Sequence, residues 1–279
     1  RPDKPSPLPC GIAVLTTTLT ATRPYTTTII HSIYLQIFQY ILCIHIKYQY
    51  GECIIAKLAL ITIHGMGETP VDYAQGLFED LRERLGNDAW SQILTGSVYY
   101  QDILQDNQYA YYNRIKDVTN WDSLRKFLLF GFSDAASLET MKEGRDSPYF
   151  RAQEKILNAL KMAYKSVDKG GAVVFLAQSL GCQVLSNYLW DASRKKKQPN
   201  YGVWSSHGDS FNDPQEEEFC RGSEIRRLYT TGCNIPIFVA GRSRDTIKAI
   251  KKPNQAFQWR NYYDADDAKL NVHEYFVPK

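Results

Sequence analysis

The stretch VVFLAQSLGCQ, residues 173–183, determines how the rest of the chain is interpreted. Its opening apolar run is typical of a buried parallel strand, and the apolar residues that follow Ser179 recur at helical spacing. Ser179 is therefore predicted to lie at a junction between a strand and a helix. Two interpretations fit this position: a serine that only caps a helix, as serine commonly does, and a nucleophile presented on a sharp turn.

Small residues on either side of Ser179 favour the second interpretation. A sharp strand-to-helix turn brings neighbouring backbone close to the serine, so small residues are needed nearby, and Ala177 and Gly181 meet that need. A serine hydroxyl is a weak nucleophile unless a base takes its proton and a third group orients that base. The amide of Leu180, at the predicted helix start, would point to where an oxyanion forms.

An earlier strand supplies a second candidate loop. Residues 57–63 (KLALITI) are apolar and β-branched, and His64-Gly65-Met66-Gly67 follows directly before a predicted helix over 71–85. The amide of Met66 is the candidate for a second oxyanion donor. The same glycines fit a simple tight turn. No GxGxxG pattern and no Lys-Ser/Thr pair follows, which argues against a nucleotide site.

The remaining patterns alternate between strands and helices. A mainly parallel sheet is therefore expected, with its ligand site at the carboxyl ends of the strands. Residues 195–222 are polar and lack periodicity, so they predict a loop or cap insertion; residues 101–150 fit either a lid or scaffolding. The further expected strands are 92–100, 225–231 and 255–263, and the further expected helices are 122–130 and 150–166.

The combination of AQSLG after VVFL with IHGMG after the first strand resembles the α/β-hydrolase superfamily, in particular its lipases and esterases. The resemblance covers about residues 56–279. It implies an α/β-hydrolase fold, with a mostly parallel sheet flanked by helices on both faces and a cap or lid insertion. It also implies that Ser179 is the nucleophile, with Met66 and Leu180 as backbone oxyanion donors. Ala177 stands where the family usually has the first glycine of G-x-S-x-G.

The resemblance further implies an acid and a base downstream of Ser179. The acid is expected after the strand 255–263; Asp267 is favoured and Asp264 is the runner-up, although such a cluster in isolation is usually a solvated turn. The family order Ser, Asp, His leaves only His273 as the base. It follows Asp267 by fewer residues than is usual, so either the chain is shortened here or the base lies beyond residue 279.

The other histidines have less to recommend them as the base. His207 lies before the acid in the sequence and would break the family order. His64 belongs to the oxyanion loop, together with Gly65, and is expected to shape that loop by hydrogen bonding. His31 and His45 fall in an atypical N-terminal stretch.

Composition narrows the function classes. The 279 residues carry 33 basic and 30 acidic side chains, a net charge of +3, which does not indicate nucleic acid as a partner. Six cysteines form no CxxC pair and no zinc-site spacing, so neither a metal nor a disulfide framework is expected, and no cofactor is implied. Such cysteine usage favours a reducing, cytoplasmic location.

The first 55 residues differ in composition from the rest of the chain. Residues 1–28 are rich in threonine and proline, whereas residues 29–46 are apolar but interrupted by His, Gln and Ser. This segment is expected to be a disordered or non-native extension, and a membrane anchor over 29–46 is the alternative. Membrane association depends on the anchor being native.

The sequence thus predicts a serine hydrolase that cleaves carboxylic esters through an acyl-enzyme on Ser179. Asp267 and His273 complete the predicted triad. The predicted substrate is a small ester or a lipid. A hypothesis of another class is a catalytically incomplete α/β-hydrolase-like protein that serves as a binding scaffold.

Overall fold

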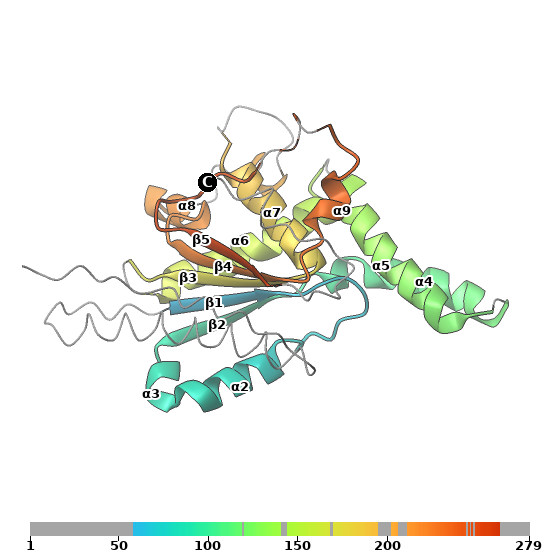
Figure 1. Cartoon of the computed structure of the whole chain (residues 1–279), viewed down its shortest axis with the longest axis horizontal. Helices are drawn as coiled ribbons and strands as arrows, with labels where there is room; N and C mark the ends of the chain where they lie inside the picture. The colour runs from blue at the N-terminus through green and yellow to red at the C-terminus, as the bar shows by residue number, and fades with distance from the viewer. Residues whose placement is uncertain are drawn as a thin grey trace, which may run out of the picture.

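The computed structural model describes residues 58–118, 120–140, 144–167, 170–194, 202–205, 211–243, 245, 247 and 249–262. A five-stranded parallel sheet forms its centre, in the order β2-β1-β3-β4-β5 (Figure 1). The strands are β1 (Leu58–Ile63), β2 (Ile93–Val98), β3 (Val173–Gln178), β4 (Ile225–Thr231) and β5 (Gln258–Tyr262). The prediction of a parallel α/β sheet is confirmed.

Helices cover both faces of this sheet. On one face, Ala59, Ile61 and Phe175 pack in a core with α6 (Pro148–Ser166) and α7 (Leu180–Ala192). On the other face, Leu60 and Val174 pack with α2 (Gln75–Leu85), which leads into the short α3 (Asn87–Trp90). Neighbouring residues along a strand point to opposite faces, so a strand covered on both sides needs an unbroken apolar run. This explains why KLALITI and VVFL carry no polar alternation.

The chain changes direction in the sheet between β2 and β3. From β1 it moves outward to β2, then returns to place β3 on the other side of β1. The connections after β1 and β3 therefore leave the sheet toward opposite faces. In open α/β sheets, ligands bind at such a reversal, just outside the carboxyl ends of the two strands.

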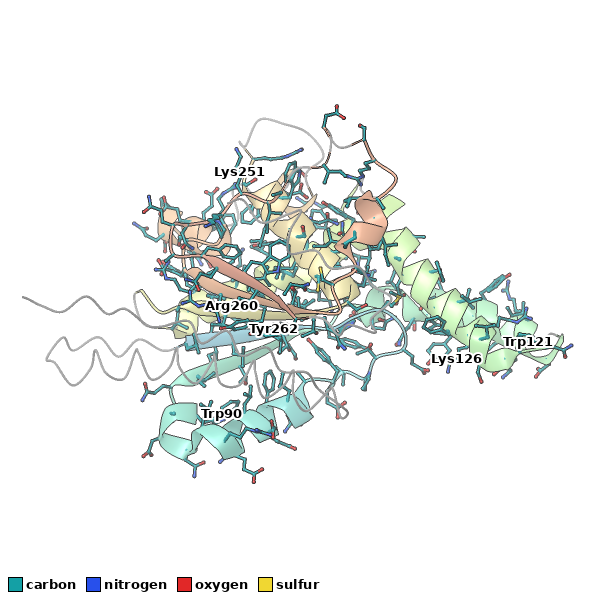
Figure 2. The ribbon with its side chains drawn as sticks, viewed as in Figure 1. Trp90, Trp121, Lys126, Lys251, Arg260 and Tyr262 are labelled. Carbon is teal, nitrogen blue, oxygen red and sulfur yellow. The ribbon has the colours of Figure 1, made fainter. Side chains whose placement is uncertain are left out.

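A helical hairpin projects from the end of the molecule nearest these carboxyl ends (Figures 1 and 2). It consists of η1 (Gln101–Ile103), α4 (Gln105–Ile115), η2 (Lys116–Val118) and α5 (Asp122–Thr140). Trp121 lies at its tip and is 77% exposed. The hairpin's inner end is buried through Phe130 and Leu138. Only 122–130 was expected to be helical, so α4 and the second half of α5 were missed.

The polar insertion predicted over 195–222 is partly wrong. Its described parts include η3 (Gly202–Ser205) and α8 (Pro214–Cys220), which pack against α6. Val203 and Phe219 belong to the main core. These elements are too short to show a periodic pattern. A capping signal was nevertheless present, because the Asp213 side chain accepts a hydrogen bond from the Glu216 amide at 2.7 Å, directly before a proline at the helix start.

Smaller differences concern element ends. The helix expected over 71–85 begins at Gln75, because residues 71–74 form a turn after Pro70. After β4 the chain forms the short α9 (Ile235–Val239), which was not predicted. Within the described ranges no helix is both long enough and apolar enough to cross a bilayer. Residues 29–46 lie outside those ranges, so the anchor hypothesis for them remains a prediction.

Candidate active site

Ser179 sits on a strained turn between β3 and α7. Its φ of 49° and ψ of −117° place it in a region that L-residues rarely occupy. Among the described non-glycine residues, only Trp121 and Ser179 have a positive φ. Trp121 lies at an exposed hairpin tip, whereas Ser179 is only 7% exposed. A strained conformation held in a packed site points to function, since packing must compensate for the strain.

Gly181 is required by the packing of the turn. A Cβ added at this residue would lie 2.3 Å from the carbonyl oxygen of His64 and 2.9 Å from that of Ile63. Both neighbours are backbone atoms at the end of β1, so they cannot swing away as a side chain would. Ala177 pairs with Ile63 in the sheet and is fully buried. The expectation that small residues flank Ser179 because backbone approaches closely therefore matches the geometry.

The loop after β1 lies against Ser179. A Cβ added at Gly65 would come within 3.0 Å of the Ser179 Cβ and 3.6 Å of its Oγ. Since β1 and β3 are paired neighbours, their carboxyl ends bring Gly65 and Ser179 together, although 113 positions separate them in the sequence. The HGMG loop and the turn at Ser179 thus form one local site.

Tyr100 and His64 hold the start of this loop. The Tyr100 hydroxyl lies 2.9 Å from the His64 carbonyl oxygen and 2.8 Å from that of Gly65, and donates between them. The Tyr100 amide donates to His64 Nε2 at 3.1 Å, which leaves the proton on Nδ1; Nδ1 in turn donates to the Gly65 carbonyl at 2.8 Å. The two rings stack at 4.0 Å between centroids. His64 thus shapes the loop by hydrogen bonding.

His64 is poorly suited to act as the base for Ser179. Both ring nitrogens already have backbone partners, and burial lowers its pKa from 6.5 to about 4. The ring is therefore neutral at pH 7. It would have to break a backbone hydrogen bond before accepting a proton from a serine. His64 is the only histidine in the described part of the chain.

The two amides predicted to bind an oxyanion have no hydrogen-bond partner among the described residues. Within the described residues, no hydrogen bond engages the amide of Met66 or that of Leu180. Leu180 is the first residue of α7, where amides lack an intrahelical partner and the helix dipole favours negative charge. The Ser179 amide, by contrast, donates to the Thr231 carbonyl at 2.9 Å, which ties the turn to the end of β4. The amides of Met66 and Leu180 are thus free to receive an oxyanion, as the sequence predicts for them.

The predicted acid and base lie outside the described residues. These are Asp264, Asp267 and His273, and the rejected candidate His207 lies outside them as well. The last described residue before Asp264 is Tyr262, which ends β5 and pairs with Thr231 of β4. Thr231 in turn is level with Gln178, the residue before Ser179. The chain therefore leaves β5 at the same edge of the sheet as the serine.

Asp134, a buried carboxylate beside the loop, was not predicted from the sequence. Its Oδ2 accepts from the Gly67 amide at 2.8 Å, and the side-chain amides of Gln101 and Gln108 also donate to it. Burial raises the pKa of Asp134, while these three donors act in the opposite direction. A signal was present: Asp134 lies four residues from both Phe130 and Leu138, on the buried stripe of α5.

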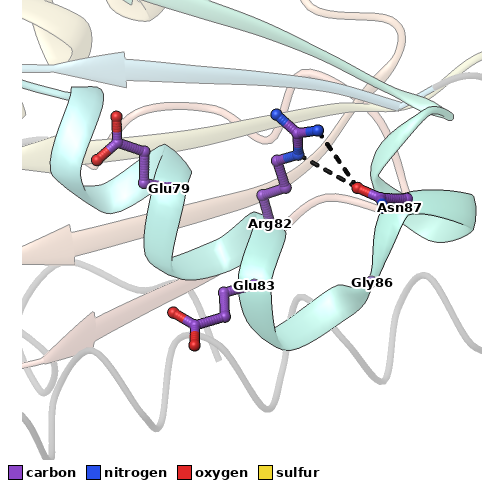
Figure 3. Close-up of a pocket in the computed structure, with 5 residues that line it drawn as sticks. All are labelled: Glu79, Arg82, Glu83, Gly86 and Asn87. Carbon is purple, nitrogen blue, oxygen red and sulfur yellow. Dashed lines mark hydrogen bonds between the residues drawn. The ribbon is translucent and has the colours of Figure 1, made fainter.

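A hollow of about 320 Å³ elsewhere on the molecule has a different character (Figure 3). It lies beside the end of α2, on the side of the sheet where β2 begins, and is lined by Glu79, Arg82, Glu83, Gly86 and Asn87. Arg82 donates to the Asn87 Oδ1 from two nitrogens at 3.3 Å. Its lining is charged and solvated, without a buried polar group to orient a ligand. We assign no function to it.

In the described ranges, no three His, Cys, Asp or Glu side chains gather closely enough to hold a metal ion. The three described cysteines, Cys182, Cys220 and Cys233, are buried and free.

Comparison with models of known protein families found no match, and no curated protein matches the chain significantly. The geometry around Ser179 is thus the basis for a functional assignment.

Proposed function

We propose that the protein is a serine hydrolase of the α/β-hydrolase type that cleaves carboxylic esters. The observation that carries the proposal is the backbone of Ser179. It is strained, with a φ of 49°, between β3 and α7, and the HGMG loop lies against it. A helix cap needs no such strain, because N-cap residues normally adopt extended backbone angles. Ser147 and Asp213, which cap α6 and α8, do so.

In the proposed reaction, the Ser179 hydroxyl attacks the ester carbonyl while a base removes its proton. The carbonyl oxygen becomes an oxyanion that accepts hydrogen bonds from the amides of Met66 and Leu180. The base returns the proton to the leaving alcohol, and an acyl-enzyme remains. Water, activated by the same base, then releases the acid and restores the serine. We propose His273 as the base and Asp267 as the group that orients it.

The proposed partners are small esters or lipids, without a metal or organic cofactor. The stretch predicted to be a lid or scaffolding, residues 101–150, includes the helical hairpin described above. Its inner end packs against the loop after β1, as the buried Asp134 shows. This attachment favours scaffolding over a lid that opens freely.

The test is labelling of the full chain with a serine-reactive fluorophosphonate, followed by peptide mass spectrometry. We expect one adduct on Ser179 that is absent from Ser179→Ala. Ser193→Ala is the matched control, because Ser193 caps the other end of α7 and is exposed. A folded chain that gives no adduct, or a Ser179→Ala chain that reacts equally, would overturn the proposal. The same labelling of His273→Ala then tests the proposed base.

The alternative function is a binding scaffold that has lost catalysis. One observation favours it: His64, the only described histidine, is buried, neutral and engaged at both nitrogens. If no residue beyond the described ranges supplies a base, the turn at Ser179 would retain its shape without an activated nucleophile. Absence of an adduct on a chain that unfolds cooperatively would support this alternative.

A further inference from the structure

The helical hairpin contacts the loop after β1 at three consecutive residues. The Met66 thioether lies against Gly131 of α5, where an added Cβ would be 3.1 Å from the sulfur. The next residue, Gly67, donates its amide to Asp134. Glu68 forms an ion pair with Lys126 at 2.7 Å and also accepts from the Tyr109 hydroxyl. The conformation of the loop is therefore bound to the position of the hairpin.

The two polar contacts differ in strength. The Glu68 and Lys126 side chains are 50% and 33% exposed, so water and salt weaken their attraction. Asp134 is fully buried, and its carboxyl group accepts hydrogen bonds from the Gly67 amide and from two buried glutamine side chains, so water competes little for these bonds. The carboxylate is thus the principal attachment between hairpin and loop. Lys126 and Trp121 mark the outer part of the hairpin in Figure 2.

The surroundings of Asp134 are organised to keep it an acceptor. Gln101 and Gln108 are buried and turn their NH₂ groups toward the carboxylate. Their carbonyl oxygens, Oε1 in each, have no hydrogen-bond partner among the described residues. Leaving two buried acceptors unpaired is costly, so the arrangement is explained by what the carboxylate gains from three donors.

We propose that Asp134 is a positioning residue for the oxyanion hole: its carboxylate holds the Gly67 amide and thereby fixes the preceding Met66 amide beside Ser179. The inference rests on the proposed function, since it assigns Asp134 a role in that same reaction. Asp134 touches neither substrate nor the reacting atoms. It acts through the loop, so its removal should weaken transition-state binding more than substrate binding.

The test compares two substitutions of Asp134 on the full chain, with p-nitrophenyl butyrate as substrate. Asp134→Ala removes the acceptor for the Gly67 amide. We expect kcat to fall by about 10- to 100-fold while KM changes by less than about threefold, as for a loop displaced by about 1 Å. Asp134→Asn keeps an oxygen for that amide, and its NH₂ can donate to Oε1 of Gln101 or Gln108 after those amides flip. It should recover most of kcat.

Controls separate positioning from loss of fold. Asp122→Ala removes another carboxylate of α5, one that accepts from Tyr112 on the exposed part of the hairpin, and should leave kcat unchanged. Each variant is assayed well below its midpoint of thermal unfolding. Hydrogen exchange of the peptide over 64–69 should accelerate in Asp134→Ala and be restored in Asp134→Asn.

The outcomes distinguish this inference from the proposed function. A wild-type chain that reacts with the fluorophosphonate, together with an Asp134→Ala chain of equal kcat, would overturn the inference alone. A rise in KM with constant kcat would also overturn it, because a general loss of substrate binding would then explain the effect. A folded wild-type chain that does not react at all would overturn the proposed function and, with it, this role for Asp134.

Discussion

The Ser179 turn and the hollow beside α2 show that a cavity and a site are different things. The hollow is the more open feature, yet its lining is solvated and its Gly86 has nothing within 4 Å of an added Cβ. Around Ser179, by contrast, an added Cβ at Gly181 meets backbone at 2.3 Å, and the serine itself is strained. Tight packing that forces an unfavourable conformation is the more specific sign of function.

The largest effect is expected from Gly181→Ala. The new methyl group would collide with the His64 carbonyl, and relief would require β1 and α7 to move apart. We expect a loss of about 3 kcal/mol or more in the free energy of unfolding. Urea unfolding measures this loss.

Gly86→Ala is the matched control from the hollow. Gly86 has a φ of 79°, so alanine is strained there, but the space around it is open. With its ψ of 162°, this is a conformation that is essentially confined to glycine, so we expect a loss of about 1–3 kcal/mol from backbone strain alone. Equal losses for the two variants would show that close approach of backbone does not distinguish the two regions.

The next effect concerns the pH dependence of stability through His64. Its pKa is about 4 in the folded protein and about 6.5 when unfolded, so the unfolded chain binds one more proton between these values. Stability should therefore fall as the pH drops from 6.5 to 4, by about 3 kcal/mol in total from this residue. The measurement is urea unfolding at several pH values.

His64→Gln isolates this contribution from that of the carboxylates. A glutamine oxygen can accept from the Tyr100 amide but does not titrate. The difference in stability between wild type and His64→Gln should shrink as the pH falls. Parallel curves from pH 6.5 to 4 would contradict the assignment of His64 as a buried neutral ring.

The smallest effect is expected from Ser179→Gly, which removes the strain at the turn. Glycine tolerates a positive φ, so the variant should gain about 1 kcal/mol in stability while losing activity. Thermal unfolding and the fluorophosphonate assay measure the two changes. Ser193→Gly, at a φ of −75°, should instead lose stability. A destabilised Ser179→Gly would mean that the turn is not strained.

Much of the sheet was predictable because its strands are buried on both faces. Continuous apolar runs at 57–63 and 173–176 gave β1 and β3 nearly to the residue, and the helices after them followed from periodicity. The hairpin was harder to predict. Outward-facing apolar residues blur the periodicity of α5, as Phe127 and Phe132 do at 63% and 66% exposure. Short buried elements such as η3 carry too few residues to show a pattern.

The site divides in the same way. Ser179, Gly181 and the HGMG loop were found because sharp turns beside strands demand small residues in a local pattern. Asp134 was not found, because nothing in the sequence around it indicates the Gly67 amide that it meets. Asp267 and His273 stay predictions, since both lie outside the described residues.

The sequence by itself determined the strand, turn and helix around Ser179 and the need for small residues two positions on either side of it. These are local consequences of steric exclusion and of the spacing of apolar side chains. Only the tertiary structure decided that the Gly65 loop covers Ser179, that His64 is neutral with both nitrogens engaged, and that Asp134 holds the loop. Such contacts depend on which strands pair and how deeply each group is buried, and long-range packing settles both.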